Sequence, residues 1–343
     1  MLRVKPELKP GDDWLHIKTI DMHTGGEPLR IIYDGLPEIS GKTILEKRQY
    51  FKNNLDHIRT GVIFEPRGHA DMYGAVIVEP ERSDSDFGVI FLHNEGYSTM
   101  CGHAVIALAK FAFEMGLITK GQKELKIDVP AGQVFARLNF EKNTLYSTSF
   151  RNVPSFVFAH NQQLTISEIG KITFDIAYGG AFYAICKAED FGIIIEPGSY
   201  QQIIHTGKIL KSQITQSIQV EHPFQDELSF LYGVIFTAPS EKSGVYSKNA
   251  CIFAEGELDR SATGSGVSAR AALLYKENKI KIGENITIES IIGSNMQVCV
   301  TETLKYGPYD AVIPEVTGMA FFTGNHDFYF EPTDPLKKGF ILR

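Results

Sequence analysis

The stretch Ser98-Thr99-Met100-Cys101-Gly102-His103, followed by an apolar run from Ala104 to Gly116, decides the fold of this chain. A hydroxyl side chain at Ser98 or Thr99 can accept hydrogen bonds from free first-turn amides, so either residue predicts a helix cap. The run behind it leaves almost no polar face, which predicts a buried helix. Gly116 can end this helix in a left-handed conformation. The apolar residues of the run are Val105, Ile106, Leu108, Ala109, Phe111, Ala112, Phe113 and Met115.

Cys101 lies on the expected first turn of this helix. The free amides and the dipole at a helix N-terminus favour negative charge. We therefore expect a stabilised thiolate at Cys101 and a docking place for carboxylate oxygens beside it. The alternative is a cysteine that only fills space.

Length and composition are those of an ordinary soluble globular protein. Its 343 residues exceed the roughly 100 to 200 residues of one domain, so two domains are expected. With 43% hydrophobic residues, 22% charged residues and a net charge of −7, the chain is a poor partner for nucleic acid or an anionic membrane. A small-molecule partner fits better, and a homodimer stays open. No apolar run approaches the ~20 residues of a membrane span, and the N-terminus lacks a signal-peptide core, so we expect a cytoplasmic protein.

The cysteines predict neither a disulfide framework nor a zinc site. Cys101, Cys186, Cys251 and Cys299 are far apart and form no C-x-x-C pair. The last three lie in apolar, strand-like contexts, where free cysteine usually fills the core.

Alternating patterns and turn residues predict a chain rich in strands. A strand-turn-strand unit is expected around His23–Pro28, and a second around Tyr178-Gly179-Gly180. Strands are expected at 15–22, 29–33, 72–78, 88–92, 173–176, 181–185, 230–237 and 250–254, several more within 125–158, and mostly strands over 286–330. A surface helix is expected at 42–58 and a helix of mixed polarity at 199–218.

A second polar loop and buried helix repeat the arrangement around Cys101. The segment from Glu257 to Gly266 follows a predicted strand and precedes the small-residue apolar run Val267–Tyr275. Thr263 lies 162 positions after Cys101, close to half the chain. We therefore expect two similar α/β halves, each with a central helix whose N-terminus faces the other half. The expected halves are 1–150, joined by the C-terminal tail 322–343, and 151–321.

Two such helix ends facing one cleft predict a carboxylate site. The amides of Gly102, His103, Gly264 and Ser265 would bind the anion, with the glycines allowing close approach to the backbone. The alternative is that these glycines only permit tight packing.

Two polar side chains stand beside the expected anion site. His103 and Asp259 could hold a substrate amine. Alternatively, His103 is a core histidine whose hydrogen bonds are satisfied, and Asp259 makes a contact within its loop. Spacing alone does not assign the polar loop residues His23, Glu27, His69 and Asp71 to a site or to turns.

Two rival interpretations use the same residues. The run from Gly264 to Ala269 matches G-x-G-x-x-A, but a dinucleotide site follows directly on a strand, and here the polar segment 255–262 intervenes. A hydrolase pair of Cys101 with His103 is disfavoured, because residues two apart on a helix point in different directions.

Six motifs, in order along the chain, resemble those of the proline racemase family, and within it the branch that dehydrates trans-3-hydroxy-L-proline. They are Asp21-Met22-His23-Thr24-Gly25-Gly26-Glu27-Pro28, Pro66-Arg67-Gly68-His69-Ala70-Asp71-Met72-Tyr73-Gly74, Met100-Cys101-Gly102-His103, Tyr178-Gly179-Gly180, Asp259-Arg260-Ser261 with Gly264-x-Gly266, and Val316-Thr317-Gly318. The resemblance implies an α+β, diaminopimelate-epimerase-like fold with two pseudo-symmetric halves. Each half would have a central helix wrapped by a mostly antiparallel sheet.

The resemblance also implies roles for residues and the absence of any metal or organic cofactor. Cys101 would be the acid/base thiol, the four amides would surround the substrate carboxylate, and His103 with Asp259 would lie at the ring nitrogen. Racemases of this family carry a second cysteine where this chain has Thr263. A threonine hydroxyl does not ionise near neutral pH, unlike a thiol of pKa about 8.5, so two-base racemisation should fail.

One thiol suffices for a dehydration. In trans-3-hydroxy-L-proline the hydroxyl and the Cα hydrogen both lie opposite the carboxylate, hence on one ring face. Cys101 could take the Cα proton and then protonate the departing hydroxyl, and the enamine would tautomerise to 1-pyrroline-2-carboxylate. The role of Thr263 stays open between packing and binding water. The alternatives are a proline or 4-hydroxyproline racemase or epimerase, and a non-catalytic proline-binding protein.

Overall fold

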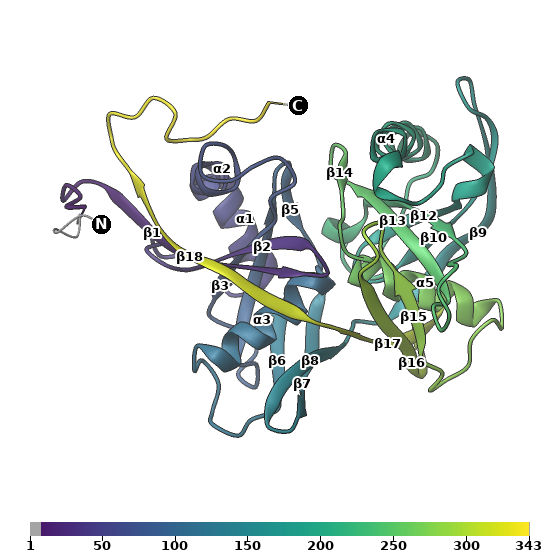
Figure 1. Cartoon of the computed structure of the whole chain (residues 1–343), viewed down its shortest axis with the longest axis horizontal. Coiled ribbons are helices and arrows are strands. Elements are labelled where there is room, and N and C mark those ends of the chain that lie inside the picture. The colour runs from purple at the N-terminus through teal and green to yellow at the C-terminus, as the bar shows by residue number, and fades with distance from the viewer. Residues whose placement is uncertain (1–7, 343) are drawn as a thin grey trace.

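The computed structural model describes residues 8–342. Residues 1–7, part of the segment predicted to lack a signal-peptide core, lie outside this range. The described chain forms two lobes of mixed α/β structure, side by side (Figure 1).

The first lobe contains α3, which carries the site-bearing cysteine at its N-terminus. Its elements are β1 (Leu15–Thr24), β2 (Glu27–Asp34), α1 (Ile44–Tyr50), a π-helix (Phe51–Leu55), α2 (Asp56–Ile63), β3 (Gly74–Val78), β4 (Phe87–His93), β5 (Gly96–Ser98), α3 (Gly102–Glu114), β6 (Glu124–Val129), β7 (Gly132–Glu141), β8 (Thr144–Arg151) and β18 (Ala320–Phe330).

The second lobe contains α5 in the corresponding place. Its elements are β9 (Ser155–Ile166), β10 (Gly170–Tyr178), β11 (Phe182–Lys187), α4 (Tyr200–Ser217), β12 (Leu231–Ala238), β13 (Ser247–Phe253), β14 (Glu257–Leu258), α5 (Gly264–Lys276), β15 (Ile286–Glu289), β16 (Asn295–Tyr306) and β17 (Tyr309–Gly318), with short 3₁₀ turns at 188–191, 197–199 and 226–228.

The strands pair mostly antiparallel, and the sheet joins the lobes. Only β2–β3, β4–β6, β11–β12 and β13–β15 are parallel ladders among the named strands of residues 8–342. Strand β17 pairs with β8 of the first lobe and with β9 of the second. The chain then crosses back, and β18 pairs with β1 from Leu15↔Phe330 to Thr24↔Ala320. The predicted division at residue 150 itself stays a prediction.

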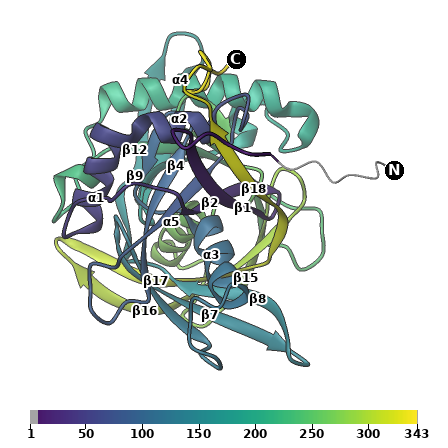
Figure 2. The same ribbon diagram turned by 90° about the vertical axis from the view of Figure 1, so that its left-hand side faces the viewer.

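Helices α3 and α5 lie in the middle of the molecule with strands around them (Figure 2). The largest cluster of buried apolar residues contains side chains from both helices and from both lobes. In α3 every residue from Gly102 to Ala109 is buried, as the unbroken apolar pattern predicts. In α5 every residue from Gly264 to Leu274 is buried.

The end of α3 confirms the prediction made from Gly116, and its beginning does not. Gly116 adopts a left-handed conformation with φ of +70°, and the Leu117 amide donates to the Ala112 carbonyl, which completes a Schellman motif. At the other end, the cap residue is Cys101 rather than Ser98 or Thr99. The Thr99 hydroxyl donates instead to the Gly180 carbonyl of the other lobe, at 2.7 Å.

Most predicted elements are present, with shifted ends. The helix expected over 42–58 is a longer helical segment over 44–63, which a π-turn interrupts. Helix α5 begins at Gly264, three residues before the predicted start. Cys186 and Cys251 are buried, as expected for core residues, but Cys299 is only half-buried, because it lies on the partly exposed strand β16. Over residues 8–342, every helix is too short or too polar to cross a membrane.

Candidate active site

The N-termini of α3 and α5 touch each other at two glycines. A Cβ atom built on Gly102 would lie 2.6 Å from the Gly264 Cα, and one built on Gly264 would lie 2.7 Å from the Gly102 Cα. Real Cβ contacts are not that short, so only glycine fits at either position. The residues just before them, Cys101 and Thr263, are the two helix caps, and each is 5% exposed.

A small cavity of about 10 Å³, roughly the space of one water molecule, lies between these helix ends. It brings together all seven residues that the sequence assigns to the site, from both lobes. It is lined by Cys101, Gly102, His103, Asp259, Thr263, Gly264 and Ser265, together with Tyr73, Met100, Tyr183, Tyr232 and Phe253. The space is far smaller than an amino acid, so the side chains of the lining must move before a ligand can enter.

Cys101 and His103 are in direct contact, which corrects a prediction. The Cys101 Sγ lies 3.1 Å from the His103 Nδ1. The argument that residues two apart point in different directions assumes that both are helical. Cys101 is the cap and has an extended backbone, with φ of −142° and ψ of 106°, so its side chain turns toward His103. Burial lowers the pKa of His103, against the opposing effect of Asp259, which favours the neutral imidazole.

Cys101 is a buried thiol rather than the thiolate expected from the helix dipole. Burial raises the pKa of Cys101 well above its usual value, and the nearby Asp259 and Glu27 carboxylates raise it further. The Ala104 amide and the Tyr73 hydroxyl act in the opposite direction but are outweighed. The sequence showed the helix end but not the second lobe that removes water from it.

Thr263 holds Asp259 in place. The Thr263 hydroxyl donates to Asp259 Oδ2 at 2.8 Å, and the Ser261 amide donates to Oδ1 of the same carboxylate at 2.7 Å. Thr263 has a φ of +66°, a conformation that β-branched residues rarely adopt. Its amide donates to the Ser261 hydroxyl. The loop before α5 is therefore a network built around the Asp259 carboxylate.

The first turns of both helices present their amides to the cavity. The earliest helical hydrogen bonds come from Val105 to the Cys101 carbonyl and from Val267 to the Thr263 carbonyl. The amides before them on each helix therefore have no backbone partner in the helix. The Ser265 hydroxyl pairs with the Tyr183 hydroxyl at 2.7 Å. Such a pair of helix ends can bind a carboxylate. The same contact leaves no room for a pyrophosphate at Gly264, which disfavours the dinucleotide interpretation.

Glu27, one of the polar loop residues, lies beside the site without lining its cavity. It is fully buried, and its Oε2 accepts the Arg260 amide at 2.7 Å. Burial, together with the Asp259 carboxylate, raises the pKa of Glu27 well above its usual value. Arg260 also pairs with Asp71 at 2.7 Å, so two contacts of one residue connect the lobes. His69, by contrast, is exposed.

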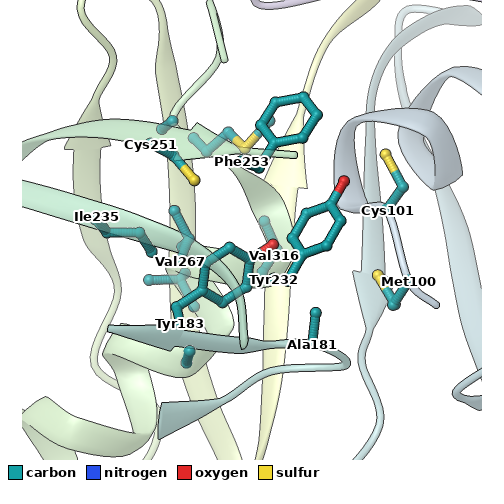
Figure 3. Packing of buried hydrophobic residues seen from close by; sticks show 14 of the residues in the cluster. Met100, Cys101, Ala181, Tyr183, Tyr232, Ile235, Cys251, Phe253, Val267 and Val316 are labelled. Atoms are coloured by element: carbon teal, nitrogen blue, oxygen red, sulfur yellow. The ribbon is translucent and has the colours of Figure 1, made fainter. Parts of the chain in front are cut away.

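The aromatic lining of the cavity was missed by sequence analysis. Tyr183, Tyr232 and Phe253 come from β11, β12 and β13 of the second lobe, and Figure 3 shows them between the core and Cys101. Their strand patterns indicate only burial, because an inward-facing tyrosine on a buried strand looks like any apolar residue. Tyr73 belongs to the motif at residues 66–74, and this was the only indication in the sequence that it could be part of the site. Over residues 8–342, no group of three or more His, Cys, Asp or Glu side chains could hold a metal ion.

Comparison with known proteins places this chain among relatives of similar length. The family model described as proline racemase matches residues 19–341. The chain is 50% identical to the trans-3-hydroxy-L-proline dehydratase of Colwellia psychrerythraea, over 97% of this chain and 94% of that protein. It is 41% identical to the human protein of the same name, over 98% of each.

Solved structures show the same overall fold. A hydroxyproline epimerase from Agrobacterium vitis, with bound trans-4-hydroxy-L-proline, superposes with a TM-score of 0.91 at 29% identity, covering 97% of this chain and 96% of that one. A Bacillus anthracis protein of the PhzF family, at 12% identity, has a TM-score of 0.60 over 91% of this chain and 99% of its own, and shows the fold alone. With the family model matched over nearly its whole length, the chain belongs to the proline racemase family.

Proposed function

We propose that this protein dehydrates trans-3-hydroxy-L-proline to 1-pyrroline-2-carboxylate, with Cys101 as the acid/base and no cofactor. The observation that carries the proposal is the pair of helix caps around one cavity. One cap is a thiol, and the other is a threonine whose hydroxyl is engaged with Asp259. The dehydratase names of the relatives at 50% and 41% identity support the same reaction.

In the proposed complex, the lobes close on the substrate carboxylate. The amides of Gly102, His103, Gly264 and Ser265 would bind it and stabilise the negative charge that builds up as Cα loses its proton. This arrangement fits the finer fold proposal of two pseudo-symmetric halves, each with a central helix that supplies half of the anion site.

The ring nitrogen would lie against the opposite wall, formed by His103 and Asp259. Asp259 is suited to a cationic amine because its two oxygens are already oriented by Thr263 and Ser261. Thr263 then acts through Asp259, as a positioning residue. We expect no second base on that face of the substrate, so racemisation should not accompany dehydration.

The reaction itself would use Cys101 twice. Its thiolate takes the Cα proton, the electron pair forms the Cα–C3 double bond, and the C3–O bond breaks. The thiol formed returns the proton to the departing hydroxide, so water leaves and the thiolate is restored. General acid/base assistance of this kind contributes roughly 10²–10⁴-fold to a rate. The enamine then tautomerises to the imine.

The direct test is incubation of the purified protein with trans-3-hydroxy-L-proline. We expect an imine that borohydride reduces to proline, and no conversion between L- and D-proline under the same conditions. Release of Cα hydrogen from both proline enantiomers into heavy water would instead support the epimerase alternative. Binding of proline or pyrrole-2-carboxylate without any turnover would support a non-catalytic binding protein.

We expect the rate to rise with pH. Because burial raises the pKa of Cys101, the active thiolate is a minor form at neutral pH, and its population grows as the pH approaches that pKa. The value of kcat/KM should therefore increase by up to about tenfold per pH unit from neutral into the alkaline range. A plateau already below pH 7 would contradict this and would favour a dipole-stabilised thiolate. A pH–rate profile of kcat/KM measures the difference.

A further inference from the structure

Tyr73 carries a hydroxyl group that the fold leaves unused. The residue directly precedes β3, is 2% exposed, and lines the cavity between the helix ends. Its hydroxyl is buried and makes no hydrogen bond of good geometry within residues 8–342, although it lies close enough to the Cys101 thiol to lower the pKa of that group. A buried hydroxyl without a partner destabilises the folded protein, and one that lines a cavity can offset this cost by binding a ligand there.

The position of Tyr73 relates this hydroxyl to the reacting thiol. Its ring makes a T-shaped contact with the imidazole of His103, with ring centroids 4.9 Å apart. After burial, Cys101 has the largest effect on the pKa of Tyr73, and the same holds for Tyr232. Figure 3 shows the hydroxyl of Tyr232 directed toward Cys101. Both phenols therefore lie on the Cys101 side of the cavity.

The stereochemistry of the substrate puts its leaving group on that same side. In trans-3-hydroxy-L-proline the Cα hydrogen and the C3 hydroxyl occupy one ring face. If Cys101 takes the Cα proton, the hydroxyl also departs toward the face that Cys101 and the two phenols share. The cavity then places the Tyr73 hydroxyl, a donor without a well-formed hydrogen bond, on the side where the leaving group needs orienting.

We propose that Tyr73 binds the 3-hydroxyl of the substrate and aligns its C3–O bond for departure, an inference that rests on the proposed dehydration. The phenol donates a hydrogen bond to the hydroxyl oxygen and strengthens it as negative charge develops there. Tyr73 keeps its own proton, and the proton that completes the water molecule comes from the Cys101 thiol. Because burial raises the pKa of Tyr73 well above its usual value, the phenol stays a donor across the working pH range.

If Tyr73 binds the 3-hydroxyl, its loss should affect departure of the hydroxide and not removal of the Cα proton. If Tyr73 only supported the fold, its loss should affect both steps alike. Removal of the Cα proton needs Cys101 and the helix amides, but departure of the hydroxide needs Tyr73 as well. A variant without the phenol should therefore still exchange the Cα hydrogen and fail at elimination. Proline itself, which lacks the 3-hydroxyl, should bind with little change.

The chain contains a matched control for the loss of a buried, unpaired hydroxyl. Tyr178 is 1% exposed, and its hydroxyl also has no partner within residues 8–342. It packs against Phe156 and Phe182 in the core of the second lobe and is not part of the cavity lining. Tyr178→Phe therefore removes the same atom in the same kind of environment, away from the site.

The experiment compares Tyr73→Phe, Tyr178→Phe and the unmodified protein in heavy water with trans-3-hydroxy-L-proline. For Tyr73→Phe we expect kcat for imine formation to fall roughly 10²-fold. Incorporation of deuterium at Cα of the recovered substrate should not fall below that seen with the unmodified protein. The ratio of deuterated substrate to imine product should therefore rise. Tyr178→Phe should change neither quantity by more than about twofold, and thermal unfolding should show both variants folded.

The outcomes distinguish a failure of the proposed Tyr73 role from a failure of the proposed dehydratase function. If Tyr73→Phe eliminates water at the unmodified rate, or loses Cα exchange in proportion to product, the inference is overturned. If the unmodified protein makes no imine at all, the proposed function fails instead, independently of Tyr73.

Discussion

Cys101→Ser should lower kcat for dehydration by roughly 10²–10⁴-fold, the whole contribution of the acid/base group. The substitution keeps the size and the cap position, and it exchanges a thiol for a hydroxyl that is far too weak an acid to supply the base. The buried setting makes the loss more severe, since the same desolvation that raises the pKa of the thiol would act on the hydroxyl. Steady-state kinetics with trans-3-hydroxy-L-proline measure the effect.

The matched control for this variant is Cys299→Ser. Cys299 is half-buried on β16 and lies outside the cavity lining, so its replacement should leave kcat within about twofold. Circular dichroism of both variants checks that they are folded. A Cys101→Ser protein that keeps more than about a tenth of the activity would refute a mechanism with a single thiol.

Gly264→Ala should lower kcat/KM by about 10²-fold or more without unfolding the protein. The glycine has no left-handed backbone, so alanine suits its conformation, and the obstacle is purely steric. The new Cβ would lie 2.7 Å from the Gly102 Cα and would force the two helix ends apart. A displacement of about 1 Å of groups that orient a substrate can cost 10²-fold in rate.

Gly198→Ala is the matched control, because the nearest atom to its new Cβ would be 3.6 Å away and its backbone is likewise not left-handed. We expect this variant to have unchanged kinetics. If Gly264→Ala were as active as the control, the contact between the two helix ends would not belong to the catalytic form of the protein. Thermal unfolding of both variants should show cooperative transitions.

Local patterns predicted what depends on local physics. The helix behind Cys101 and its end at Gly116 follow from an unbroken apolar run and one glycine, and both were correct. The hairpin of β1 and β2 was marked by alternation around Gly25-Gly26. These signals come from residues close together in the chain, so they can be recognised from the sequence alone.

What the sequence could not give depends on groups far apart in the chain. Thr99 was expected to cap α3, yet its hydroxyl is taken by the carbonyl of Gly180. Cys101 was expected as a thiolate, yet the second lobe buries it and reverses the pKa shift. The catalytic environment is therefore a property of the assembled lobes rather than of the helix end.

The tyrosines show the same limit for the candidate site. All seven assigned residues line one cavity. They could be assigned from the sequence because the motifs that contain them are distinctive. Tyr73 and Tyr232 were not assigned, because an aromatic residue in a buried strand environment predicts a core position and nothing about a hydroxyl. Tyr73 is distinguished by the combination of its place in the cavity lining and a hydroxyl without a well-formed hydrogen bond, and both are features of three-dimensional packing.

The last long strand, β18, completes the sheet that the first strand begins. During synthesis, β1 leaves the ribosome about 300 residues before its partner does, at a pace of roughly 5–20 residues per second. For the intervening seconds that edge of β1 is unpaired, and open strand edges are prone to pair with other chains. The ladder between β1 and β18 thus has one of the largest sequence separations possible in this protein, which favours slow folding and makes the newly made chain vulnerable before it is whole.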